Sequence, residues 1–370
     1  MEFKINKGTL LQGLYLAQGI ADRKSTMPIL ANVLLRADGR DRVMLAATDL
    51  NITVTAELSA KVDREGGLTV GAKHLHDIVK SLPGEEIYVQ RTENHYVNLK
   101  AGKVEYNVVG MPDRDYPKLP NHREVSFTQV DAAALRDLIA KTFFSISTDE
   151  TRYHLNGVLF ECDGAGEQAR ARMVSTDGHR LSKVERTLPG GPKLPQGVII
   201  PRKGLAELRR AIDPVSGQIE LGLHQGHLFV RAGDMVMSIK LIEAQFPPYE
   251  QVIPREQSKV AVLSRTGFLE ALKRISIMSS DKTYGIKFTL EPHLLRIQSD
   301  NPDLGQGREE LDADYDGPEL TIGFNARYFI EFLSEVDTPE VRLELSGELD
   351  PGVLRPSTGD YLGVIMPMRI

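Results

Sequence analysis

Three side chains that could form a hydrolytic site lie within four residues of one another in the segment STDGHRL, residues 175–181. Thr176 could serve as a nucleophile, His179 as its general base and Asp177 as the group that orients the base. The same segment also suits a tight turn, because an Asp side chain accepts hydrogen bonds from its own backbone and Gly178 adopts turn conformations at little cost. A turn at the rim of a binding pocket is therefore the alternative to a catalytic site.

No common enzyme signature accompanies this segment. The sequence contains no GxxxxGK[ST] phosphate loop, no HExxH zinc motif and no GxSxG nucleophile elbow. His74 and His76 are two residues apart, which places them on different helical faces and disfavours a shared metal ion. The single cysteine, Cys162, can form neither an internal disulfide nor, alone, a metal site. We therefore expect no metal and no cofactor.

Composition indicates a protein that is neither secreted nor embedded in a membrane. The 370 residues are 41% hydrophobic, which supplies cores for two or three domains. No window approaches about 18 consecutive apolar residues, and the start, MEFKINKGTL, lacks the basic stretch and apolar run of a signal peptide. We expect a cytoplasmic protein with no membrane partner. The net charge of −6 disfavours a protein that coats nucleic acid through bulk positive charge.

The elements around residues 175–181 recur three times along the chain. Each repeat begins with a short alternating strand and a helix with apolar residues at helical spacing, so that Leu14, Leu138 and Leu272 occupy corresponding positions. A second strand and amphipathic helix follow in each repeat, and two alternating strands come after them. The six predicted helices span residues 7–20, 73–82, 131–144, 202–212, 265–277 and 325–336.

The polar turn recurs as well, without its histidine. A Thr-Asp or Ser-Asp pair follows an apolar strand at residues 48–49, 176–177 and 299–300. This recurrence favours the turn interpretation of Asp177, because Asp side chains support tight turns in many contexts and catalytic groups are not repeated in this way.

Short helices among many strands indicate an α+β fold with antiparallel sheets. Two amphipathic helices in each repeat would pack their apolar faces on a sheet. Pro-rich stretches at residues 113–120 and 245–254 lie where linkers between repeats are expected. The sequence therefore predicts three tandem domains, at residues 1–122, 123–254 and 255–370.

Positive charge is concentrated in the predicted helices. The six helices together carry a net charge of +6. Because the whole chain carries −6, its other residues together carry −12. Ordinary solvated helix faces would explain this pattern. If the repeats gather their helices on one surface, that surface would be positive and would suit a polyanion held by its phosphates without base reading.

Several motifs, taken in order along the whole chain, resemble one protein family. They are TMPIL (26–30), RYHLNGVLFE (152–161), STDGHRL (175–181), IIPRKG (199–204) and VIMPMRI (364–370). Together with the three tandem repeats, they make the chain similar to the beta subunits of bacterial DNA polymerase III, the beta sliding clamps.

This resemblance implies a non-catalytic processivity factor. In this family two copies join head to tail into a closed ring of six domains around duplex DNA, with sheets outside and helices lining the hole. Sequence-independent phosphate contacts suit a ring that slides, and tethering holds a polymerase at high effective concentration. The implied partners are double-stranded DNA, the replicative polymerase alpha subunit, the clamp loader, other clamp-motif proteins of replication and repair, and a second copy of the chain. The implied location is the cytoplasm, in association with the nucleoid.

The resemblance also implies a partner-peptide groove between the second and third domains, with Leu, Val and Met as an adaptable apolar lining. The matching residues are Leu155, Thr176, Gly178, His179, Arg180, Leu181, Pro247, Val252, Val364, Met366, Pro367, Met368 and Arg369.

Two further sets of residues match the family by position. The DNA-facing positions correspond to Lys24, Lys73, Arg202 and Lys203. At the dimer interface, Tyr106 and Val108 on an edge strand of the first domain are expected to meet Ile277 and Met278 near the first helix of the third domain in the other subunit.

Two functions from other classes remain open at this point. One is a hydrolase that uses Thr176, Asp177 and His179, although no oxyanion-loop motif accompanies them. The other is a repeat scaffold with no role at DNA.

Overall fold

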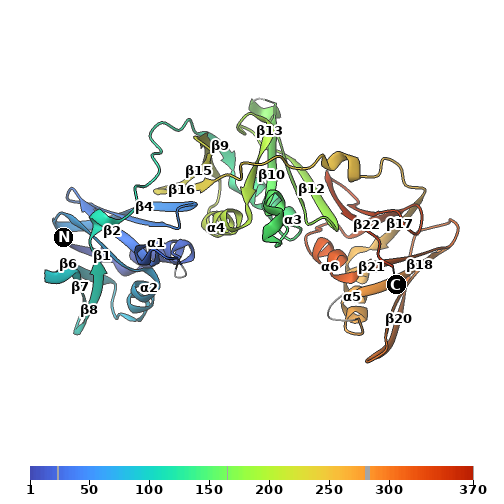
Figure 1. The fold of residues 1–370 in the computed structure, drawn as a ribbon, viewed down its shortest axis with the longest axis horizontal. Helices are drawn as coiled ribbons and strands as arrows, with labels where there is room; N and C mark the ends of the chain where they lie inside the picture. The colour runs from blue at the N-terminus through green and yellow to red at the C-terminus, as the bar shows by residue number, and fades with distance from the viewer. Residues whose placement is uncertain (23–24, 165, 280–283, 370) are drawn as a thin grey trace. The chain divides into compact units, whose positions relative to one another are not determined.

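A computed structural model describes residues 1–22, 25–164, 166–279 and 284–369 of the chain (Figure 1). The chain divides into two compact units, the first formed by residues 1–133 and 203–241 and the second by residues 134–202 and 242–370. The predicted central repeat therefore contributes to both units. No helix in the described ranges is both long enough and apolar enough to cross a membrane.

One sheet of 12 strands runs through the first unit, in the order β1-β6-β7-β8-β5-β2-β3-β4-β16-β15-β14-β9. Its strands are β1 (Glu2–Asn6), β2 (Asn32–Asp38), β3 (Arg42–Thr48), β4 (Ile52–Arg64), β5 (Gly66–Gly71), β6 (Glu86–Arg91), β7 (Tyr96–Ala101), β8 (Val104–Met111), β9 (Thr128–Asp131), β14 (Gln218–His224), β15 (His227–Ala232) and β16 (Met235–Lys240). β4 pairs antiparallel with β16 from Ile52↔Ile239 to Ala56↔Met235. The sheet of the first repeat therefore continues into that of the second.

Helices α1 (Lys7–Ile20) and α2 (Ala72–Ser81) pack against each other in the first unit. This unit also contains α4 (Arg202–Ile212), except for its first residue. The Asn6 side chain starts α1 by accepting the N–H groups of Gly8 and Thr9. The helix then buries Leu10 and Leu14 at the four-residue spacing that the sequence indicated.

The second unit contains a sheet of eight strands, in the order β13-β10-β11-β12-β24-β23-β22-β17, and one of four strands, in the order β20-β19-β18-β21. Its strands are β10 (Gly157–Asp163), β11 (Arg170–Thr176), β12 (Arg180–Thr187), β13 (Leu194–Pro201), β17 (Lys259–Ser264), β18 (Gly285–Glu291), β19 (Leu294–Asn301), β20 (Gly305–Asp312), β21 (Leu320–Asn325), β22 (Glu340–Leu345), β23 (Gly352–Pro356) and β24 (Tyr361–Ile365). Its helices are α5 (Arg265–Ser276), α6 (Ala326–Ser334) and all but the first two residues of α3 (Ala132–Phe143).

Aromatic side chains fill the core between α5, α6 and the four-stranded sheet. The rings of Phe268, Phe288, Phe324 and Phe329 lie with centroids 5.0 to 6.0 Å apart in tilted and T-shaped pairs. All four side chains are fully buried. Edge-to-face pairs of this kind add to the stabilisation that burial of apolar area provides.

The helix predictions are confirmed. All six predicted helices occur, and their ends lie within two residues of the predicted ones. The apolar periodicity of 3.6 residues was a sufficient signal because each helix buries one face on a sheet.

The two Pro-rich connections are anchored to the sheets that they cross. Tyr116, in the first connection, is buried against Ile29, Leu34 and Ala46. Its hydroxyl accepts the N–H of Thr48 at 3.2 Å. In the second connection Phe246 and Tyr249 are buried on the eight-stranded sheet. These connections therefore act as packed straps and not as loose linkers.

Tyr116 should make stability fall at alkaline pH. Burial raises its pKa from 10.0 to about 12, so the folded chain holds this proton more tightly than the unfolded chain. The stabilisation is complete below about pH 10 and is lost as the pH rises to about 12, with a total of about 2–3 kcal/mol. Urea unfolding at several pH values should show a steeper alkaline loss for the unmodified protein than for Tyr116→Phe. Equal slopes would contradict this assignment.

Candidate functional site

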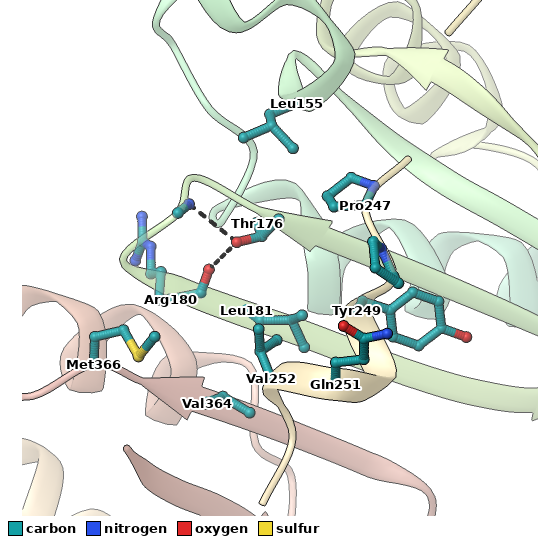
Figure 2. Close-up of a pocket in the computed structure, with 12 residues that line it drawn as sticks. Leu155, Thr176, Arg180, Leu181, Pro247, Tyr249, Gln251, Val252, Val364 and Met366 are labelled. Carbon is teal, nitrogen blue, oxygen red and sulfur yellow. Dashed lines mark hydrogen bonds between the residues drawn. The ribbon is translucent and has the colours of Figure 1, made fainter. Parts of the chain in front are cut away.

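An apolar groove of about 260 Å³ opens on one face of the eight-stranded sheet, the face opposite to α3 and α6 (Figure 2). One wall is the turn between β11 and β12, the other is the second strap, and β24 closes one end. The lining residues are Leu155, Thr176, Gly178, Arg180, Leu181, Pro247, Pro248, Tyr249, Gln251, Val252, Val364 and Met366.

Strand alternation and strand pairing build the groove floor. Leu181 on β12 lies directly opposite Val364 on β24, and both side chains join a buried cluster that contains Leu155, Phe246 and Tyr249. Because successive side chains of a strand point to opposite faces, one residue of register shift would remove this floor. The strap covers only part of the cluster, and the uncovered part is the groove.

Residues 176–180, which include the three candidate catalytic side chains, form a hydrogen-bonded turn. The Thr176 hydroxyl donates to the carbonyl oxygen of Arg180 at 2.6 Å and accepts the N–H of Gly178 at 3.0 Å. Asp177 Oδ1 accepts the N–H groups of His179 and Arg180 at 2.9 and 3.1 Å. Gly178 has a φ of +89°, which favours glycine at this position. The His179 side chain is exposed and is not hydrogen-bonded to Thr176, so the geometry of a catalytic triad is absent from these described residues.

The first repeat uses the same turn chemistry. Thr48 donates to the carbonyl oxygen of Ile52 and accepts the N–H of Leu50, while Asp49 Oδ1 accepts the N–H of Asn51 at 2.9 Å. Leu50 has a φ of +74° where the second repeat has glycine, a conformation that costs an L-residue about 1–2 kcal/mol.

The sequence predicted the same turn at residues 299–300 of the third repeat, and the structure differs there. There Asn301, and not Asp300, accepts the backbone N–H two residues on, that of Asp303, at 2.9 Å. Asp300 instead accepts the side-chain amide of Gln306. The shared Asp turn is therefore a property of two repeats only, because the neighbouring Asn performs the same local bonding in the third.

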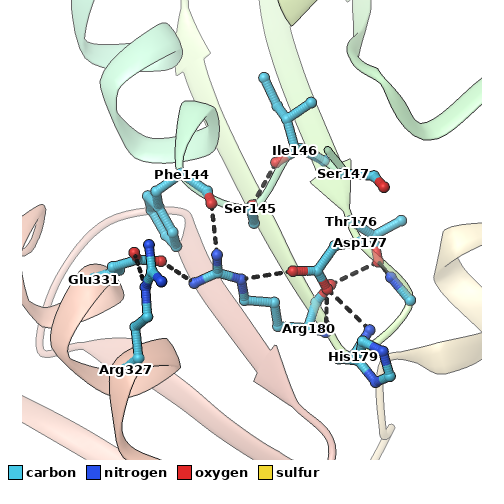
Figure 3. Close-up of polar contacts among 12 residues, drawn as sticks. Phe144, Ser145, Ile146, Ser147, Thr176, Asp177, His179, Arg180, Arg327 and Glu331 are labelled. Carbon is cyan, nitrogen blue, oxygen red and sulfur yellow. Dashed lines mark hydrogen bonds and ion pairs between the residues drawn. The ribbon is translucent and has the colours of Figure 1, made fainter. Parts of the chain in front are cut away.

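Arg180 is held away from the groove by a network on the helix side of the sheet (Figure 3). Its guanidinium donates to Asp177 Oδ2 at 3.1 Å, to the carbonyl oxygen of Phe144 at 2.6 Å and to Glu331 on α6. Its carbon Cζ lies 4.4 Å from the ring centre of Tyr328. Only 9% of the side chain is exposed. Arg180 therefore joins the turn to α6, and mainly its backbone and aliphatic part are left for the groove.

The Tyr249 hydroxyl also points out of the groove. It donates to Glu161 Oε2 at 2.9 Å and accepts from Arg172 at 3.1 Å. Burial first, and then the bond to Glu161, raise the pKa of Tyr249 well above its usual value. The ring is thus fixed as an apolar wall.

Nine of the thirteen predicted groove residues line this pocket. The other four, which lie outside its lining, are His179, Pro367, Met368 and Arg369. Pro248, Tyr249 and Gln251 also line the pocket and were not among these thirteen. Their position between Pro247 and Val252 on the strap was the one available signal.

The predicted DNA-facing residues differ in how free their charges are. Lys73 is exposed on α2. Arg202 stacks on Phe143 at 4.8 Å and donates to the carbonyl oxygen of Ile146. Lys203 pairs with Asp49. Lys24 lies outside the described residues.

The predicted interface residues lie at free strand edges or beside them. β8 pairs with β7 along its length, but with β5 only at Gly110 and Met111, which leaves an open edge that carries Tyr106 and Val108. β20 pairs only with β19 within the described residues. Ile277, which follows α5, is 72% exposed, and Met278 lies against Gly307 of β20.

No group of three or more His, Cys, Asp or Glu side chains that could hold a metal ion occurs in the part of the chain that the structure describes. Burial raises the pKa of the Cys162 thiol to about 11, so at neutral pH this cysteine is a thiol and a poor nucleophile. The chemistry that the site offers is apolar contact with a few neutral hydrogen-bonding groups.

Paired helices on antiparallel sheets that run from one repeat into the next, with an apolar groove beside such a junction, define a protein of the DNA-clamp class. Three family models match consecutive parts of the chain: the N-terminal domain of the DNA polymerase III beta subunit at residues 1–120, its central domain at 129–248 and its C-terminal domain at 250–369. The chain belongs to this family, the beta sliding clamps.

Relatives of this chain match it over its full length. The beta sliding clamp of Caulobacter vibrioides is 34% identical over 373 residues, with 100% of both chains covered. A crystal structure of the Caulobacter crescentus clamp, with PEG bound to a suggested beta-motif tethering region, matches 100% of both chains with a TM-score of 0.93 at 33% identity. The DNA polymerase III subunit beta from Pseudomonas aeruginosa matches equally completely, with a TM-score of 0.93 and 33% identity. The chain is accordingly a processivity factor of DNA polymerase, a non-catalytic subunit.

Removing the Asp177 carboxylate should destabilise the turn. In Asp177→Ala two backbone N–H groups and the Arg180 guanidinium lose an acceptor, which should lower the free energy of unfolding by about 1–3 kcal/mol. Asp177→Asn keeps an oxygen acceptor for the N–H groups and should lose less than half as much. Urea unfolding followed by circular dichroism measures both. Equal losses would show that the charge of residue 177, and not its acceptor oxygen, holds the turn.

Proposed function

We propose that two copies of this chain close head to tail into a ring around duplex DNA. The domains would be residues 1–122, 123–254 and 255–370, each contributing two helices to the inner surface. Lys24, Lys73, Arg202 and Lys203 would contact phosphates without reading bases, which suits a ring that must slide. Such a protein would act in the cytoplasm, at the nucleoid.

Two free strand edges support the head-to-tail joint. An exposed edge is a liability unless another strand or chain covers it. The open part of β8 carries Tyr106, which is 39% exposed, and β20 offers an open edge near Ile277 and Met278. Joining β8 of one copy to β20 of the next would satisfy both edges. Different surfaces at the two ends of the chain give a heterologous contact that can close into a ring.

We propose further that the groove binds a short linear peptide of partner proteins. The observation that carries this proposal is a recess of about 260 Å³ lined by Leu, Val, Met, Pro and Tyr side chains beside a sheet junction. The PEG molecule bound to the suggested beta-motif tethering region of the Caulobacter crescentus clamp supports it. The partners would be the replicative polymerase alpha subunit, the clamp loader and other clamp-motif proteins of replication and repair.

The ring proposal predicts topological binding to DNA. Loaded by its clamp loader onto a nicked circular plasmid, the protein should stay bound during gel filtration and be lost when the plasmid is linearised. Ile277→Asp should fail to be retained on the circle and should elute as a monomer, because a charge in an apolar joint is unpaired. Leu349→Asp, which adds the same charge at an apolar residue as exposed as Ile277 (74% against 72%) and outside the joint, is the control. Equal retention on circular and linear DNA would overturn the ring.

The groove proposal predicts a selective loss of partner binding. Met366→Ala should weaken binding of a partner peptide by about fivefold or more, since truncating an anchor in an apolar pocket costs at least about 1 kcal/mol. Met27→Ala is a matched control, because Met27 and Met366 are similarly exposed, at 43% and 40%. Fluorescence polarisation gives the affinities, and light scattering checks that the dimer persists. An unchanged affinity in Met366→Ala would refute the site.

A further inference from the structure

The groove contains almost no free charge. Of the twelve residues that line it, Arg180 is the one charged side chain. His179 and Arg369 lie outside the lining. The electrostatic character of the groove therefore depends on whether the Arg180 charge is available to a ligand.

The Arg180 charge is already compensated. Asp177 and Glu331 both accept from its guanidinium, and Glu331 also accepts from Arg327 at 2.8 Å. Two guanidinium groups and two carboxylates thus form a neutral network. In addition to its contact with Tyr328, Arg180 Cζ lies 5.3 Å from the ring centre of Phe144. Turning the guanidinium toward a ligand would break these contacts, and a ligand carboxylate would compete with two resident ones.

The remaining polar groups of the lining are neutral, and most are occupied. The Thr176 hydroxyl is used within its turn, and the Tyr249 hydroxyl is bound to Glu161 and Arg172. The Gln251 side chain is exposed and makes no hydrogen bond with the described residues. Its amide offers both a donor and an acceptor without charge.

The neighbouring surface is not positively charged either. Beyond Met366 and Gln251 a second recess of about 530 Å³ continues the groove. Its charged lining residues are Arg255, Glu256 and Asp350, which together carry −1. A carboxylate on a bound peptide would meet a net negative surface here.

We propose that this groove selects peptides whose segment between the apolar anchors is uncharged, with Gln251 as the specificity-determining residue and Arg180 as a positioning residue. The inference rests on the proposed peptide-binding function. An acidic side chain in that segment would lose water without gaining a charge partner, whereas a neutral hydroxyl or amide could bond with the Gln251 side chain.

Three synthetic fluorescent peptides test the proposal. Each carries two leucines and a phenylalanine as anchors, and they differ at one position between the anchors, which is serine, glutamate or lysine. We expect the glutamate peptide to bind at least about tenfold more weakly than the serine peptide. The affinity for the serine peptide should change by less than about twofold between roughly 50 and 500 mM salt, because no ion pair is formed.

Adding a cation at Gln251 should reverse the preference. In Gln251→Arg the glutamate peptide should bind at least as tightly as the serine peptide, and its binding should weaken with salt. Gln218→Arg adds the same charge at an exposed residue of β14 outside the groove, and should leave the ratio of the two affinities unchanged.

The outcomes separate this inference from the proposed function. If none of the peptides binds, peptide recognition by the groove is wrong. If the serine peptide binds and the glutamate peptide binds equally or more tightly, the groove stands and its selection of uncharged peptides is overturned. If Gln251→Arg leaves the preference as it was, the role of Gln251 is overturned.

Discussion

The pairing of β12 with β24 is the contact on which the groove depends. It joins strands from the second and third repeats into one antiparallel sheet and sets Leu181 beside Val364. The same register sends Tyr361 to the other face, where its ring stacks on Phe332 of α6 at 4.4 Å. One ladder therefore fixes the floor of the groove on one face and the packing of a helix on the other.

Ion pairs close the helix side of the same junction. Lys141 on α3 is buried and pairs with Asp137 at 2.5 Å and with Asp337 at 2.7 Å, while Arg180 reaches Glu331. Buried charges are costly unless partners and hydrogen bonds surround them, and here each has both. Apolar packing under the strap and ionic contacts at the helices thus hold opposite faces of one sheet junction. The groove residues keep their positions because both faces are held.

The helices and the turn could be predicted from sequence because they depend on local signals. Each helix shows its periodicity within its own residues, and the bonds made by Thr176 and Asp177 stay within four residues. The role of Arg180 could not be predicted, because its partner Glu331 is 151 residues away. Tyr249 lay in a stretch interpreted as a linker, since nothing local indicates that its ring is buried on a distant sheet. The third turn was wrong in detail because either of two adjacent polar residues can bond the same backbone group.

Because the groove floor combines β12 with β24, the last strand of the chain, it can form only late in synthesis. β12 leaves the ribosome long before β24 is translated, and until then Leu181 has no neighbour on that side. The growing chain can complete its first unit's strands up to β16 while the groove does not yet exist. If partner peptides bind this groove as proposed, their binding would distinguish a finished molecule from a nascent or truncated one without any separate checkpoint.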